Sequence, residues 1–151
     1  MAEEFENECL KEKQITKQPG AVPIKEERER ELRFKGFKSN SDYFLEGAKL
    51  VLETNAPYLA MVLGFFAMEH MINALIAKKG YLIKNHECAQ MYLSKYLDRK
   101  DLAQNLSKAY NMRIAYNYRF NLKENPDKTE AERFVNEVVV PFIEEIDKLM
   151  P

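Results

Sequence analysis

The sequence predicts an all-α protein, an antiparallel up-and-down bundle of four or five helices. Apolar residues recur three and four positions apart through most of the last two-thirds of the chain. The segments between these runs are short and carry Asn, Pro, Gly and Lys, which is typical of helix ends. Sustained two-residue alternation and hairpin signals such as Asn-Gly do not occur, so strands are not expected. Short connections favour antiparallel neighbours in the bundle.

Length and composition fit one globular domain with one core. The chain has 151 residues, of which 46% are apolar and 31% are charged. The net charge of -1 gives no overall attraction to nucleic acid or an anionic membrane, so such binding needs a local patch. Two cysteines are too few for a disulfide framework, and the N-terminus lacks the residue order of a signal peptide. A cytoplasmic location is therefore expected.

Residues 1–38 are expected to form a charged N-terminal arm, mobile or loosely docked, outside a helical bundle of residues 39–151. Residues 1–36 hold nine acidic and eight basic side chains, with few large apolar residues before Leu32. Such a composition buries little apolar surface. The alternating charges of "IKEERERELRF" are consistent with one short helix within the arm.

The first two helices of the bundle are predicted at 42–54 and 57–79. The segment "SNSD" at 39–42 offers several N-caps for the first helix. Pro57 suits the first turn of the second helix. The segment "KKG" then closes the second helix with basic residues and a glycine C-cap.

The second helix, "YLAMVLGFFAMEHMINALIA", is apolar on almost every side. It must therefore be the centre of the bundle or face a second subunit. Glu69, His70 and Asn73 interrupt the apolar run, which favours burial in protein over a membrane span. No membrane segment is expected. The methionines of this helix are core residues or part of a dimer seam; they are Met61, Met68 and Met71.

Three further helices complete the predicted bundle. Asn85 is expected to cap a third helix at 86–97, and a fourth follows at 99–121. The segment "NPDKTE" separates the fourth helix from a fifth at 129–149. Within it, "FVNEVVVPFI" is β-branched enough for a strand, but the flanking acidic helical sequence favours helix. Pro141 should kink or interrupt this last helix.

The fourth helix carries an arginine where its pattern calls for an apolar side chain. Between residues 99 and 123 there are six basic side chains and one acidic one, whereas residues 129–149 hold six acidic and two basic ones. At 100° per residue, six side chains fall within roughly 40° of one line along the helix, and they form the expected buried stripe. Its members are Leu102, Leu106, Ala109, Arg113, Tyr116 and Phe120.

Two interpretations of Arg113 remain open. It is a structural arginine that pairs with an acid of the fifth helix or caps carbonyl groups, or it binds phosphate through its guanidinium fork. Tyrosine rings nearby would then stack on bases. Asn117 lies on the same side of the helix, within reach of a hydrogen bond, whereas Tyr118 lies further round.

The other polar candidates favour packing roles. His70 is expected to be a hydrogen-bonded core or interface histidine, and His86 to cap or pack at the start of the third helix. "HECAQ" begins like a zinc-binding HExxH segment but lacks the second histidine, so no metal site and no cofactor are expected. Cys88 is expected to be a small buried residue.

The helix order and three segments resemble the HEPN domain, a helical bundle found in prokaryotic toxins and nucleotidyltransferase partner proteins. The segments are "FFAMEHMINALIAKKG" in the second helix, "KNH" opening the third and "RIAYNY" ending the fourth. The similarity covers residues 41–149 and leaves the arm outside it. HEPN ribonucleases carry Arg, four to six residues, then His; one toxin branch reads Arg, four residues, His, any residue, Tyr.

Arg113 matches that arginine, but Tyr118 stands where the histidine would be and Phe120 where the tyrosine would be. A second HEPN branch ends this helix with Arg, three residues, Asp and Tyr, and Arg113, Asn117 and Tyr118 fit it with Asn for Asp. The resemblance implies metal-independent RNA cleavage by a ribose 2′-hydroxyl, which needs a base near neutral pH. Tyrosine, with a pKa of about 10, does not supply one.

The resemblance therefore implies a nucleotide-binding or RNA-binding module that is non-catalytic or weakly catalytic. It further implies a homodimer packed through the second and fourth helices, and a small nucleotidyltransferase partner in a toxin-antitoxin type of system. One alternative is a ribonuclease in which Tyr116, Tyr118 or a histidine such as His70 replaces the missing base; another is a plain interaction bundle. The expected binding residues are Arg113, Tyr116, Asn117, Tyr118 and Arg119.

Overall fold

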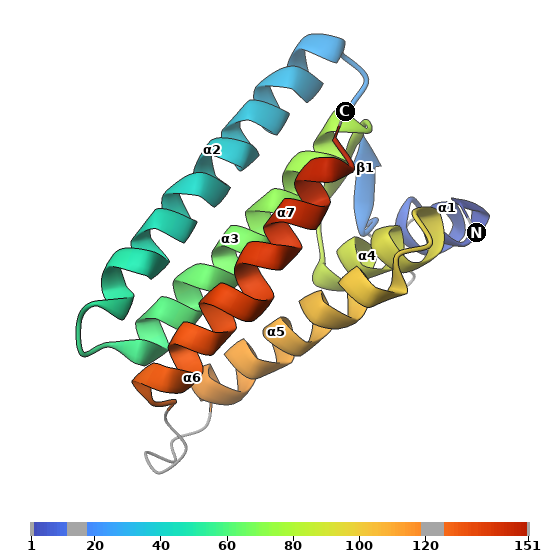
Figure 1. Cartoon of the computed structure of the whole chain (residues 1–151). Coiled ribbons are helices and arrows are strands. Elements are labelled where there is room, and N and C mark those ends of the chain that lie inside the picture. Colours follow the sequence, from blue (N-terminus) through green and yellow to red (C-terminus); the bar gives the residue numbers. More distant parts are fainter. Residues whose placement is uncertain (1, 12–17, 119–125, 151) are drawn as a thin grey trace.

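The computed structural model describes residues 2–11, 18–118 and 126–150 and confirms an all-α bundle. Its centre is a long antiparallel helix pair, α2 (Glu27–Leu52) and α3 (Pro57–Lys78). Figure 1 shows α7 beside α3, and α5 on the side of α3 that faces away from α2. The bundle is thus arranged around α3.

Helix α3 is the core helix that its composition predicts. More than half of its residues are buried, and Pro57 occupies its first turn. Gly80 follows its C-terminus with φ of 107°, a left-handed conformation that glycine adopts without a Cβ clash. By length and mean hydropathy α3 could cross a membrane, but 61% of its most apolar 18-residue stretch is buried inside the protein. That burial fits a core helix of the bundle.

Helix α2 starts much earlier than the sequence predicts. The predicted N-cap segment lies in its middle, because the alternating charges from Glu27 onward continue the helix through it. Ser41 is fully buried, and its hydroxyl donates a 2.8 Å hydrogen bond to the carbonyl of Ala67 on α3. Its polar group is therefore satisfied across the helix pair instead of at a helix end. The division at residues 38 and 39 stays a prediction, but residues 27–38 belong to α2.

The third and fourth predicted helices form a bent pair. Helix α4 (His86–Met91) runs into a π-helical segment, η1 (Tyr92–Tyr96), and α5 (Lys100–Tyr118) follows after a short turn. Asn85 caps α4 as expected, since its side-chain oxygen accepts a 2.9 Å hydrogen bond from the backbone N–H of Cys88.

The last predicted helix is present and is interrupted as its proline predicts. It consists of α6 (Lys128–Arg133), the π-helical η3 (Phe134–Val139) and α7 (Val140–Lys148). Pro141 has no N–H to donate and clashes with the preceding turn of an α-helix, and a π-helical segment widens the helix at that place.

The arm contains structure that the sequence did not predict. Helix α1 (Ala2–Cys9) packs on η1, and strand β1 (Ala21–Pro23) pairs antiparallel with β2 (Tyr81–Ile83), which follows α3. Each strand has only three residues, too few for an alternation pattern to reveal. Phe5 is fully buried and places its ring against tyrosines of β2 and η1.

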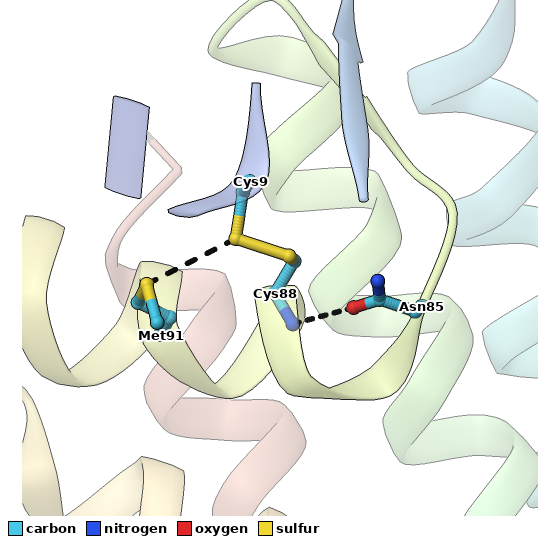
Figure 2. The surroundings of a disulfide bond; sticks show 4 residues. All are labelled: Cys9, Asn85, Cys88 and Met91. Atoms are coloured by element: carbon cyan, nitrogen blue, oxygen red, sulfur yellow. Dashed lines mark hydrogen bonds between the residues drawn. A yellow bond between two sulfur atoms is a disulfide. The ribbon is translucent and has the colours of Figure 1, made fainter. Parts of the chain in front are cut away.

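A disulfide joins the arm to the bundle, which the small number of cysteines did not predict. Cys9, the last residue of α1, is bonded to Cys88 of α4 across 79 positions of sequence (Figure 2). Cys88 is buried as expected, but it is one half of a covalent link and not only a small core residue.

Candidate functional site

Arg113 lies on α5 at the end of the buried stripe that the sequence predicts. Leu102, Leu106 and Ala109 are buried, and Arg113 one turn further on is half-buried. The stripe points at α3, because α5 packs on that helix. The arginine therefore continues an apolar surface into a position that is only partly covered.

Two phenylalanine rings of α3 lie beneath the guanidinium of Arg113. Its Cζ atom is 5.2 Å from the ring centroid of Phe65 and 5.5 Å from that of Phe66. Ring faces attract a cation at this distance. Its Nε atom is buried and finds no hydrogen-bond partner in the part of the chain that the structure describes. A buried, unpaired donor of this kind costs free energy unless a ligand or water satisfies it.

Glu69 of α3, one turn beyond Phe65, brings a carboxylate into electrostatic reach of Arg113. Burial raises the pKa of the Glu69 carboxyl above its usual value, and the positive charge of Arg113 partly offsets that rise. The two side chains are close enough to interact electrostatically, yet Arg113 forms no ion pair within the described residues. Arg113 thus retains charge that no carboxylate of the described residues neutralises by direct contact.

The acidic last helix pairs with a different arginine. Arg99, just before α5, forms ion pairs of 2.9 Å with Asp101 and 3.2 Å with Glu145 of α7. This is the structural role that one interpretation assigned to Arg113. Within the described residues, Arg99 fills it.

His86, the first residue of α4, joins Arg113 through the same aromatic cluster. Its ring stacks on Tyr110 of α5 with centroids 3.8 Å apart, and it lies 6.4 Å from Phe65. Burial, and secondly the charge of Arg113, lowers the pKa of His86 to about 4. The ring is therefore neutral at pH 7.

A hydrogen bond occupies Nε2 of His86. The side-chain amide of Gln90, one turn along α4, bonds to this nitrogen. Nε2 is therefore engaged within α4 and is not a free basic nitrogen. The expected packing role of His86 agrees with this arrangement.

A pocket of about 170 Å³ lies beside this cluster, between α3, α4 and α5. It is mixed in character: Glu69, Asn73 and His86 bring polar groups, and Ile72 and Leu106 bring apolar ones. A closed cavity of 150 Å³ is known to hold a benzene ring, so the space suits one planar ring or a few waters.

The remaining predicted site residues are only partly visible. Tyr116, Asn117 and Tyr118 lie on the last turn of α5, but their side chains are outside the described residues. Arg119 is outside them altogether. His70 does not join the cluster: its ring stacks on Phe44 of α2 with centroids 5.1 Å apart. Burial lowers the pKa of His70, and its Nδ1 atom has no hydrogen-bond partner among described residues.

Sequence reasoning did not group the residues of α3 and α4 with Arg113. Glu69 and Asn73 were a usable signal, because two polar residues four positions apart on an apolar helix share one face. Nothing local indicates that this face meets His86, since that contact depends on how α4 packs on α5.

Comparison with known families identifies the fold. Residues 35–146 match the HEPN domain. No curated protein and no solved structure matches the chain. The matched range includes α3, α4 and α5, and so contains every described residue of the cluster around Arg113. Because the match covers well over half of the sequence, the chain belongs to the HEPN domain family.

Proposed function

We propose that the protein binds a phosphate group of a nucleotide or of RNA at Arg113 and does not cleave it. The observation that carries this proposal is the half-buried guanidinium without a direct counter-ion in the described chain, whose Nε atom has no partner. A phosphate would supply both the negative charge and the acceptor oxygens that this group lacks.

The surroundings of Arg113 support an anionic, ring-bearing ligand. The rings of Phe65 and Phe66 hold the guanidinium in place by cation–π contacts, which use none of its hydrogen-bond donors. His86 adds a neutral imidazole ring from α4. The ring-sized pocket that His86 lines suits a nucleobase.

Binding without cleavage follows from the missing base. Cleavage through the 2′-hydroxyl needs a group that accepts a proton near neutral pH. Tyr118 stands at the histidine position of the ribonuclease motif, and a phenol is protonated at that pH. His86 is near Arg113, but its Nε2 is already hydrogen-bonded to Gln90. Arg113 alone can stabilise charge without taking up a proton.

A degenerate ribonuclease is the second candidate function. Because His86 lies near Arg113, it is a better candidate for the catalytic base than His70, which packs against α2. This ribonuclease requires that Gln90 releases His86 when RNA binds, or that Tyr116 or Tyr118 acts as the base. A plain interaction bundle, the third candidate, predicts neither binding nor cleavage.

The expected partners remain predictions. The expected homodimer would pack through α3 and α5, and a small nucleotidyltransferase would be the second component of a toxin-antitoxin type of system. The cytoplasmic location is likewise a prediction. Light scattering of the purified protein tests the dimer, and co-purification with a small nucleotidyltransferase from the same cells tests the second partner.

The test combines cleavage and binding in one gel. Labelled single-stranded RNA is incubated with the protein in chelator, and labelled ATP is tested separately by filter retention. Arg113→Ala should weaken retention by roughly tenfold to a hundredfold, as expected for a lost charged hydrogen bond of about 1.5 to 3 kcal/mol. Arg113→Lys should recover only part of the affinity, because an ammonium lacks the planar fork.

Lys108→Ala is the matched control, since it removes the same charge from an exposed position of α5 about 140° round the helix. Its retention should stay close to that of the parent protein. Cleavage by the parent that Arg113→Ala abolishes would replace the binding module with the ribonuclease. Equal retention by parent and Arg113→Ala would remove Arg113 from the site.

A further inference from the structure

The disulfide lies at the junction between the arm and the helix that carries His86. Cys9 and Cys88 have Cα atoms 5.8 Å apart, and both residues are buried. Figure 2 shows the bond reaching from α1 to α4, one turn from the Asn85 cap. It therefore fastens the arm to the element from which His86 enters the candidate site.

We propose that the Cys9–Cys88 bond is a reversible redox latch: a dithiol reductant opens it, releases α1 from the bundle and loosens the start of α4. The proposal concerns the arm and α4 themselves, so it does not depend on which ligand Arg113 binds.

Few other contacts hold α1 in place. Phe5 is its one large buried side chain in the described range, with edge-on contacts to Tyr81 at 5.5 Å and Tyr92 at 5.3 Å. An ion pair between Glu4 and Lys95 is about half-exposed and adds little. Helices of eight residues do not persist alone in water. Once the bond is open, Phe5 is therefore the main side chain that holds α1 among the described residues.

Release of α1 would loosen the start of α4, because the arm packs closely against it. The N–H of Cys88 donates to the side-chain oxygen of Asn85, which starts the helix. Gly20 of the arm packs against both residues: a Cβ there would lie 2.4 Å from Cys88 Sγ and 2.6 Å from Asn85 Nδ2. The arm, the cap and the disulfide thus form one contact region, directly next to His86.

The chemistry is thiol–disulfide exchange. A thiolate of the dithiol attacks one sulfur and displaces the other cysteine as a thiolate, which takes up a proton; the second reductant thiol then releases the first cysteine. The dithiol becomes a disulfide, and Cys9 and Cys88 gain two electrons and two protons. Because both sulfurs are buried, attack requires α1 to open locally. Met91 Sδ lies 3.9 Å from Cys9 Sγ and offers the reduced thiol a weak acceptor.

The experiment measures amide hydrogen exchange by mass spectrometry on the full chain, oxidised and after treatment with excess dithiothreitol. Thiol alkylation and intact mass report the state of the two cysteines. On reduction, exchange in residues 2–9 should rise by roughly tenfold or more, because opening no longer meets a covalent bond. Exchange at the start of α4 should rise with it, whereas the centre of α3 should stay unchanged. Oxidised glutathione should restore the original pattern.

Cys9→Ser is the matched variant, since it removes the bond and keeps a small side chain. Its α1 should exchange quickly with or without reductant. The latch is overturned if dithiothreitol leaves the bond intact in the folded protein, or if complete reduction leaves α1 exchange unchanged. Faster exchange in α1 with an unchanged α4 would overturn the transmission to His86.

Discussion

Removing the Cys9–Cys88 bond should lower the free energy of unfolding by several kcal/mol. The bond closes a loop across 79 positions, so the unfolded chain loses much of its conformational freedom. In the chain-entropy description a loop of this size is worth about 4.5 kcal/mol at 25 °C. The reduced native protein regains some freedom in α1, which offsets part of this effect. The expected loss is about 3 to 4.5 kcal/mol.

Urea unfolding followed by circular dichroism measures this loss, with and without dithiothreitol. The parent protein should become less stable on reduction, whereas Cys9→Ser should have the same low stability in both buffers. The slope against urea should be smaller for the oxidised protein, because a crosslinked unfolded chain exposes less surface. A loss below about 1 kcal/mol would refute the reasoning, since the crosslink would then restrict the unfolded chain far less than its loop length requires.

Four further substitutions test the packing and the electrostatics. Gly36→Ala should stabilise the protein by about 0.5 to 1 kcal/mol, because a Cβ at this position meets nothing within 4 Å. Gly64→Ala should not stabilise it, because the new Cβ would lie 3.0 Å from the buried Val139. Thermal unfolding compares the two variants. Ser41→Ala should cost about 1 kcal/mol in urea unfolding by removing a buried hydrogen bond. The pKa of His86 is about 4 in the folded protein and near 6.5 in the unfolded chain, so the unfolded chain binds more protons between these pH values. The free energy of unfolding should therefore rise with pH across this window. In His86→Gln the rise should be less steep.

The helical part of the fold could be predicted because its signals are local. Apolar spacing, the Asn85 cap and the prolines at 57 and 141 each act within a few residues. The start of α2 could not be predicted in the same way. Ser41 looks like an N-cap in sequence, and only its bond to the Ala67 carbonyl shows why it lies inside a helix.

The arm was misjudged because its order depends on distant partners. Phe5 is one large apolar residue in a charged segment, and its burial depends on tyrosines of β2 and η1. The pairing of Cys9 with Cys88 is equally non-local. Composition describes what a segment can bury by itself, not what the rest of the chain offers it.

The candidate site shows the same division. The position of Arg113 on a buried stripe follows from helical periodicity, and the structure confirms the stripe up to that residue. Its neighbours do not follow from periodicity, because Phe65, Glu69 and His86 come from two other helices. Neither does the absence of an ion pair between Arg113 and the described part of the last helix, whose Glu145 pairs with Arg99 instead.

The salt dependence of RNA binding tests the central claim most directly. Affinities of the parent, Arg113→Ala and Lys108→Ala for labelled single-stranded RNA are measured by anisotropy in chelator at several salt concentrations. If Arg113 binds a phosphate, Arg113→Ala should bind more weakly and flatten the plot of log affinity against log salt by about 0.7, the value for one phosphate contact of a single strand. Lys108→Ala should keep the parent slope. Identical slopes and affinities for the parent and Arg113→Ala would contradict the account.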